Sequence, residues 1–136
     1  MAGLLQIDEP ARASRPDAPC WSALLEMGFR PLYMAGGLWA AVSVALWIFA
    51  PGWLVGRMPG VYWHAHEMLW GVIATIAAGF LLTAATNWTG INPMRGAPLG
   101  AFCVLWLAAR IGYLVPGDAA FIIAGACEVL GFVWVA

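Results

Sequence analysis

The longest apolar stretch of this sequence places the strongest constraint on its fold. It runs from Tyr62 to Gly90, and the part from His64 to Ala85 carries a single charged residue, Glu67. A helix needs about 20 apolar residues to cross the hydrocarbon core of a bilayer, because each residue adds only about 1.5 Å. This stretch therefore predicts a membrane-spanning helix.

The composition predicts an integral membrane protein. Hydrophobic residues make up 63% of the 136 residues and charged residues 10%, whereas soluble domains carry about 25% charged residues. Lysine is absent, and the net charge of -1 gives no basic surface for nucleic acid. The cysteines lack metal-site spacing, so Cys103 and Cys127 are interpreted as small buried apolar residues. The predicted fold class is an all-α, polytopic transmembrane helical bundle.

The chain divides into a polar tail and a membrane region. Residues 1–20 are polar and contain prolines and charges without an apolar core, so they are not a signal peptide, and we expect a mobile tail. Residues 21–136 form the predicted transmembrane region, which opens with a short interfacial helix at 21–27. Proline and glycine clusters separate four predicted membrane helices, at about 31–50, 64–86, 99–115 and 119–136.

The fourth predicted helix has two unusual features. It is still apolar at Ala136, so we expect an incomplete span and a chain that is the N-terminal part of a larger membrane domain. Glu128 lies in its middle, where a lone carboxylate costs at least about 2.5 kcal/mol. No Lys or Arg of the earlier helices is expected at that depth, because Arg110 can extend to the interface. Glu128 is therefore expected to be protonated or to have a partner outside these residues.

Small and polar residues recur at every fourth position of the second helix. The stripe consists of Glu67, Gly71, Thr75, Gly79, Thr83 and Asn87. On an α-helix this spacing makes one face that drifts by roughly 40° per step. Small residues let another helix approach and polar ones bond across the contact, so the stripe predicts a packing face. A shorter small-residue face on the first helix consists of Gly37, Ala41 and Ala45.

The only two histidines, His64 and His66, begin the second helix. Imidazole binds haem iron and copper, so both are candidate metal or haem ligands. Two residues apart on a helix, they point roughly 200° away from each other and cannot both bind one ion unless the first turn frays. Glu67 can reach His64 and orient its ring. The ordinary alternatives are satisfied interfacial histidines and a carboxylate favoured by a helix start.

Charged residues near the helix ends predict an orientation. Arg30 precedes the first helix and is interpreted as a lipid headgroup anchor, with pairing to a carboxylate as the alternative. The positive-inside rule sets four arginines against one, namely Arg12, Arg15, Arg30 and Arg95 against Arg57. We therefore expect a cytoplasmic N-terminus, with both histidines at the outer end of the second helix.

Three motifs taken together resemble one protein family. They are Gly28-Phe29-Arg30-Pro31, then Trp63-His64-Ala65-His66-Glu67-Met68-Leu69 with Gly79-Phe80-Leu81-Leu82-Thr83-Ala84, and Asn87-Trp88-Thr89-Gly90. In this order they resemble the N-terminal part of the NnrS family, polytopic bacterial membrane proteins linked to nitric oxide metabolism and described as containing haem and copper. The resemblance implies haem or copper positions at His64, His66 and Glu67, and further ligands on C-terminal helices of the full-length protein.

The resemblance sets the leading functional expectation. It implies an integral haem/copper protein of the bacterial cytoplasmic (inner) membrane that acts in the nitric oxide and nitrosative stress response. Protection of metal centres or metal handling is expected rather than catalysis, so no enzymatic activity is assigned. Expected partners are the lipid bilayer and the remaining C-terminal helices. The alternatives are a proton-linked solute or ion transporter, with Glu67 and Glu128 as proton-linked sites, and a structural membrane subunit.

Overall fold

The computed structural model describes residues 21–54 and 57–136, and within these ranges every regular element is a helix. This confirms the predicted all-α bundle. The predicted mobile tail at 1–20 lies outside the described residues. Three helices are long and apolar enough to cross a membrane, namely α2 (Phe29–Phe49), the continuous helix Gly60–Thr89 and α6 (Asp118–Val135). α5 (Ala97–Gly112) is also apolar but shorter.

The second membrane helix has three consecutive parts. These are α3 (Gly60–His66), the π-helical segment η2 (Glu67–Ala74) and α4 (Thr75–Thr89). The helix therefore begins four residues before the predicted start at His64. Two short elements complete the fold, α1 (Trp21–Leu24) and η1 (Pro51–Trp53). α6 is long and apolar enough for a crossing by length and composition, and the expectation that this span is incomplete stays a prediction.

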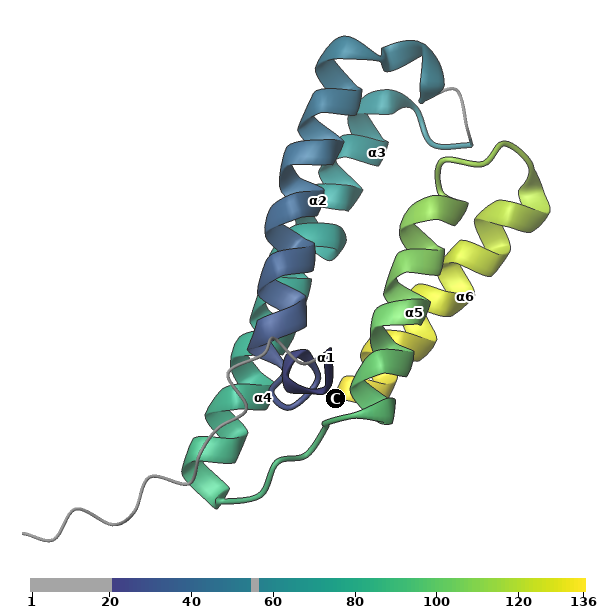
Figure 1. The fold of residues 1–136 in the computed structure, drawn as a ribbon. Helices are drawn as coiled ribbons and strands as arrows, with labels where there is room; N and C mark the ends of the chain where they lie inside the picture. Colours follow the sequence, from purple (N-terminus) through teal and green to yellow (C-terminus); the bar gives the residue numbers. More distant parts are fainter. Residues whose placement is uncertain (1–20, 55–56) are drawn as a thin grey trace, which may run out of the picture.

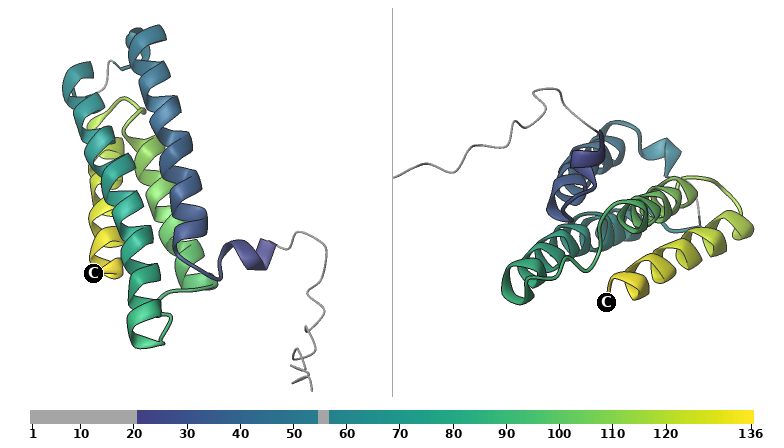
Figure 2. Two further views of the ribbon diagram at one scale, coloured as in Figure 1. Left: turned by 90° about the vertical axis from the view of Figure 1, so that its left-hand side faces the viewer. Right: turned by 60° about the horizontal axis from the view of Figure 1, so that its bottom comes forward.

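The long helices form two antiparallel pairs (Figure 1). α2 packs along η2 and α4, and α5 packs along α6. The left view of Figure 2 shows α2 and α5 toward one side of the bundle, with α4 and α6 toward the other. The loop with η1 and the loop between α5 and α6 lie at one end, and the α4–α5 loop lies at the opposite end.

Small residues allow the close approach within each pair. A Cβ added at Gly79 of α4 would lie 3.1 Å from the Leu32 side chain of α2. A Cβ added at Gly112 of α5 would lie 2.9 Å from the Ala124 side chain of α6. In lipid, such packing replaces the hydrophobic driving force that would join helices in water.

The small-residue face of the first helix contacts no other helix among the described residues. Gly37, Ala41 and Ala45 are exposed, and a Cβ added at Gly37 would meet nothing within 4 Å. The neighbouring Gly36 is buried instead, against Ile76 of α4. Because α2 is apolar on every side, its sequence does not distinguish the side that faces lipid from the side that faces protein.

Two buried clusters join the helix pairs. The apolar cluster consists of Leu32, Ala78, Leu82, Met94, Leu99 and Phe102. The tryptophan cluster consists of Trp39, Leu54, Trp63 and Trp106. Cys103 is half-buried against the apolar cluster and Cys127 is half-buried on α6, so both cysteines are free thiols inside helices. The candidate site lies beside the tryptophan cluster.

Polar contacts hold both ends of the bundle. At one end Arg57 forms an ion pair with Asp118 at the start of α6. At the other end the Gly96 N–H donates to the Leu25 carbonyl over 2.7 Å. Arg30 Nη1 donates to the Ala23 carbonyl over 2.6 Å and lies 3.5 Å from the Glu26 carboxylate. The carboxylate pairing considered for Arg30 is thus present, and its contact with lipid headgroups stays a prediction.

Candidate functional site

Four ionisable side chains from three separate helices meet inside the bundle, and we call them the polar centre. They are His66 of α3, Glu67 of η2, Arg110 of α5 and Glu128 of α6. Glu67 and Arg110 are 0% exposed and Glu128 is 8% exposed. Charged groups at membrane depth are costly and mark functional positions by default, so this is the candidate site.

Glu67 is held by two donors on its Oε2 atom. Trp39 Nε1 of α2 donates over 2.6 Å, and Arg110 Nη1 donates over 2.8 Å. Short charge-assisted bonds of this kind offset the loss of water around a buried carboxylate. Glu67 therefore connects its own helix to both α2 and α5.

Arg110 does not extend to the interface, and this sequence-based expectation is wrong. Its guanidinium is fully buried and donates to both Glu67 and Glu128. The reason is geometric: a helical side chain leans toward the N-terminus of its helix. Arg110 lies close to the C-terminal end of α5, so its side chain leans back toward the middle of the span.

Glu128 has its partners within this chain, so the expectation that they lie elsewhere is also wrong. Its Oε2 accepts from Arg110 Nη2, and its Oε1 lies 3.1 Å from His66 Nε2. The positions of Arg110 and Glu128 along their helices suggested different depths in the membrane. The long arginine side chain spans that difference. The ion pair requires no protonation of Glu128.

His66 bridges the two carboxylates. Its Nδ1 lies 3.2 Å from Glu67 Oε1 and its Nε2 lies 3.1 Å from Glu128 Oε1, while its ring meets the Tyr113 ring edge to face. A ring protonated on both nitrogens can donate to both carboxylates, and the centre then carries no net charge. A neutral ring leaves one excess negative charge, because two carboxylates then face one guanidinium.

His64 lies outside the polar centre. Its ring stacks on Trp47 of α2, with centroids 4.2 Å apart and planes within 8°. His64 Nδ1 and the nearby Trp63 Nε1 are buried and have no hydrogen-bond partner among the described residues. The two histidines thus contact different helices, as their spacing predicts. The predicted contact between Glu67 and His64 is replaced by contact with His66.

The two histidines differ in whether a ring nitrogen is available to bind a metal. Both nitrogens of His66 already face carboxylates, so His66 does not fit a haem or copper ligand in this arrangement. His64 fits a single ligand position, because one of its nitrogens is buried and unpartnered. Within the described residues no group of three His, Cys, Asp or Glu side chains can hold a metal ion. The residues present therefore make one ligand position rather than a full coordination site.

The six-residue stripe of the second helix faces the neighbouring helices for most of its length. Glu67, Gly71, Thr75 and Gly79 are buried, Thr83 is half-buried, and Asn87 is exposed. Thr75 accepts from Trp106 Nε1 over 2.7 Å, and Thr83 accepts from the Phe29 N–H over 3.3 Å.

The π-helical segment explains why the stripe stays on one side. In an α-helix four residues make slightly more than one full turn, so residues spaced by four drift in one direction around the helix. A π-helix, with its i→i+5 bonds, has more residues per turn, so the same four residues make slightly less than one turn and drift in the opposite direction. η2 thus cancels much of the drift expected from α-helical geometry. Its Gly71 leaves room for Trp39 and Arg110, since an added Cβ would lie 2.7 Å from Trp39 Cδ1 and 2.9 Å from Arg110 Nη1.

Sequence analysis did not identify Arg110 as a site residue, and it missed three aromatic residues around the polar centre: Trp39, Trp106 and Tyr113. Trp39 and Trp106 meet edge to face, and the Arg110 guanidinium lies over the Tyr113 ring at 5.5 Å from its centroid. One signal was present in the sequence, because a lone Arg in the third helix and a lone Glu in the fourth are complementary charges. The tryptophans gave no such signal, since the chain has nine of them.

Comparison with known proteins identifies a family for this chain. A family model described as NnrS protein matches residues 23–136. No curated protein and no solved structure matches this chain. The matched range contains both histidines and all four residues of the polar centre.

Proposed function

Since this chain belongs to the NnrS family of membrane proteins linked to the nitric oxide response, we propose that it handles haem or copper in that response, with His64 as the ligand that this segment supplies. The bacterial cytoplasmic (inner) membrane is the proposed location. Haem iron or copper, when bound, would provide the centre that nitric oxide coordinates. Protection or handling of metal centres fits this role better than turnover.

One observation carries the proposal for His64. The imidazole is fixed by its stack on Trp47, and its Nδ1 is buried without a hydrogen-bond partner among the described residues. Buried polar atoms are normally bonded, so such an atom calls for an explanation. A metal bound at this nitrogen would supply the missing partner. The further ligands of a complete site are not among the described residues.

The test compares the two histidines in protein purified from membranes in mild detergent. Haem absorption and metal content are measured for the wild type, His64→Ala and His66→Ala, with thermal unfolding as a check on folding. We expect His64→Ala to lose the bound haem or copper while its melting behaviour stays close to that of the wild type. A His64→Ala protein that keeps its full haem and copper content, or a wild type that binds neither, contradicts the proposal.

The polar centre favours a second candidate function, a proton-linked carrier of a solute or ion. Two buried carboxylates around an arginine at the interface of membrane helices are typical of coupling sites in transporters. Proton movement into proteoliposomes under an imposed gradient is the direct measurement. We expect the triple variant Glu67→Gln, Arg110→Met, Glu128→Gln to abolish proton movement, because its polar centre has no carboxylate or guanidinium left. A wild type that moves no protons excludes this candidate.

A further inference from the structure

From an apolar groove between α2 and α5 we infer a binding site for one anionic phospholipid, with an acyl chain in the groove and the headgroup phosphate at Arg30. The groove has a volume of about 470 Å³. On α2 its wall includes Met34, Ala35 and Leu38, on α5 it includes Leu107, and Leu24 and Leu25 lie at its end. Figure 2 shows α2 and α5 toward the same side of the bundle.

The length of the groove matches one leaflet of a bilayer. On α2 the lining runs from Pro31 to Val42, which spans about 16 Å at about 1.5 Å per residue. Half of the hydrocarbon core measures about 15 Å. An acyl chain that enters from the α1 end would therefore reach the middle of the membrane where the groove ends.

The groove accepts an apolar chain, and Arg30 beside it favours a lipid with a negative headgroup. Its lining contains aliphatic, aromatic and thiol side chains without a charged residue. Arg30 precedes Pro31 and bonds to the carbonyl of Ala23, so its half-exposed guanidinium lies at the α1 end. Both of its contacts with described residues use Nη1, so the rest of the guanidinium fork can donate to a phosphate.

Two tryptophans separate the groove from the candidate site. Trp39 and Trp106 line the groove, and their indole nitrogens donate to Glu67 and Thr75 on the opposite side. A bound acyl chain would press against these two rings and seal the polar centre from the lipid side. The inferred site is thus a structural lipid position, independent of whether His64 binds a metal.

A photo-crosslinking experiment on the wild-type protein tests this inference. The probe is phosphatidylglycerol with a diazirine in its acyl chain, in phosphatidylcholine nanodiscs, and labelled peptides are mapped by mass spectrometry. Leu38 in the groove and Val129 on α6 are 69% and 62% exposed, and both lie well inside their helices, so lipid that merely surrounds the protein would label them to a similar extent. We expect about tenfold more label at Leu38, as for a site with about tenfold preference. Equal labelling, or weaker labelling at Leu38 because another protein segment covers it, overturns the inference.

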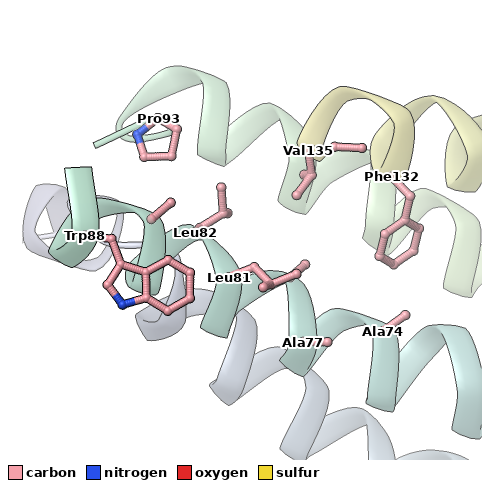
Figure 3. A pocket seen from close by; sticks show the side chains of 11 residues that line it. Ala74, Ala77, Leu81, Leu82, Trp88, Pro93, Phe132 and Val135 are labelled. Atoms are coloured by element: carbon pink, nitrogen blue, oxygen red, sulfur yellow. The ribbon is translucent and has the colours of Figure 1, made fainter. Parts of the chain in front are cut away.

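Three variants refine the result. Ala35→Phe fills the groove and should remove the excess label at Leu38. Arg30→Gln should reduce it to the level obtained with a phosphatidylcholine probe. Ala77→Phe is the matched control, because Ala77 lines a separate apolar groove between α4 and α6 (Figure 3), and it should leave the label at Leu38 unchanged. Loss of the excess label in Ala77→Phe as well, or its full retention in Ala35→Phe, overturns the inference.

Discussion

The apolar cluster and the polar centre join the same two helix pairs by different physical means. In the apolar cluster, Leu82 of α4 packs with Leu99 and Phe102 of α5. In the polar centre, Glu67 of η2 and Glu128 of α6 share Arg110 of α5. Lipid is as apolar as a leucine side chain, so the first contact adds mainly van der Waals packing. The second contact is nearly obligatory, because its charges have no other partner at that depth.

The two contacts therefore have different roles in the assembly of the bundle: one holds the helix pairs together, and the other sets their alignment. An apolar face can slide by a residue and still pack, whereas the bond from Arg110 to Glu67 links the two pairs at one pair of residues. We infer that the apolar cluster brings the pairs together and that the polar centre selects their alignment. The following predictions test that division.

The largest effect is expected for Arg110→Met. The change leaves two buried carboxylates without their cation, which costs about 3–5 kcal/mol when a buried ion pair is broken. Thermal unfolding in detergent, followed by circular dichroism, measures the loss of stability. The triple variant Glu67→Gln, Arg110→Met, Glu128→Gln should recover most of it, because it leaves no unpaired charge. A single variant as stable as the wild type would show that the polar centre does not select the alignment.

An intermediate effect is expected for Gly71→Ala. The added Cβ would lie 2.7 Å from Trp39 and 2.9 Å from Arg110, so both side chains that hold Glu67 must move. Overpacking of this kind costs about 1–3 kcal/mol, measured by the same melting experiment. Gly37→Ala is the matched control, since it also lies in a membrane helix but would meet nothing within 4 Å. Equal behaviour of the two variants would contradict close packing at Gly71.

The smallest effect is expected for Leu99→Met in the apolar cluster. Leu99 is 0% exposed, but the substitution conserves volume and polarity, so it should cost less than about 1.5 kcal/mol. The melting temperature should therefore stay close to that of the wild type, although the residue is as buried as Glu67. A loss comparable to that of Arg110→Met would mean that the apolar cluster also sets the alignment of the pairs.

Local patterns were sufficient for several features of this protein. Uninterrupted apolar lengths predicted four membrane helices, of which three are long and apolar enough to cross a membrane, whereas α5 is shorter. Proline and glycine clusters predicted the helix ends within a few residues. The spacing of His64 and His66 predicted that they face different neighbours, because that angle depends on one helix alone. The stripe from Glu67 to Gly79 predicted the packing face of the second helix for the same reason.

Contacts between helices lay beyond such patterns. Gly36 and Gly37 look alike in the sequence, yet only Gly36 is buried, since α2 is apolar on both sides. Nothing in the sequence set Trp39 and Trp106 apart from the other tryptophans, whereas in the structure their indole nitrogens donate to Glu67 and Thr75. The π-helical turn of η2 also has no clear signature beyond Gly71.

The sequence by itself determined the class of the protein, its membrane helices and its family, because these depend on composition, on apolar lengths and on motifs that are local in the chain. Only the tertiary structure decided that Arg110 turns inward and joins Glu67 to Glu128, and that His66 is engaged while His64 Nδ1 is unpartnered. These outcomes depend on the direction and reach of side chains across three helices. No local spacing encodes that reach, since it exists only once the helices have packed.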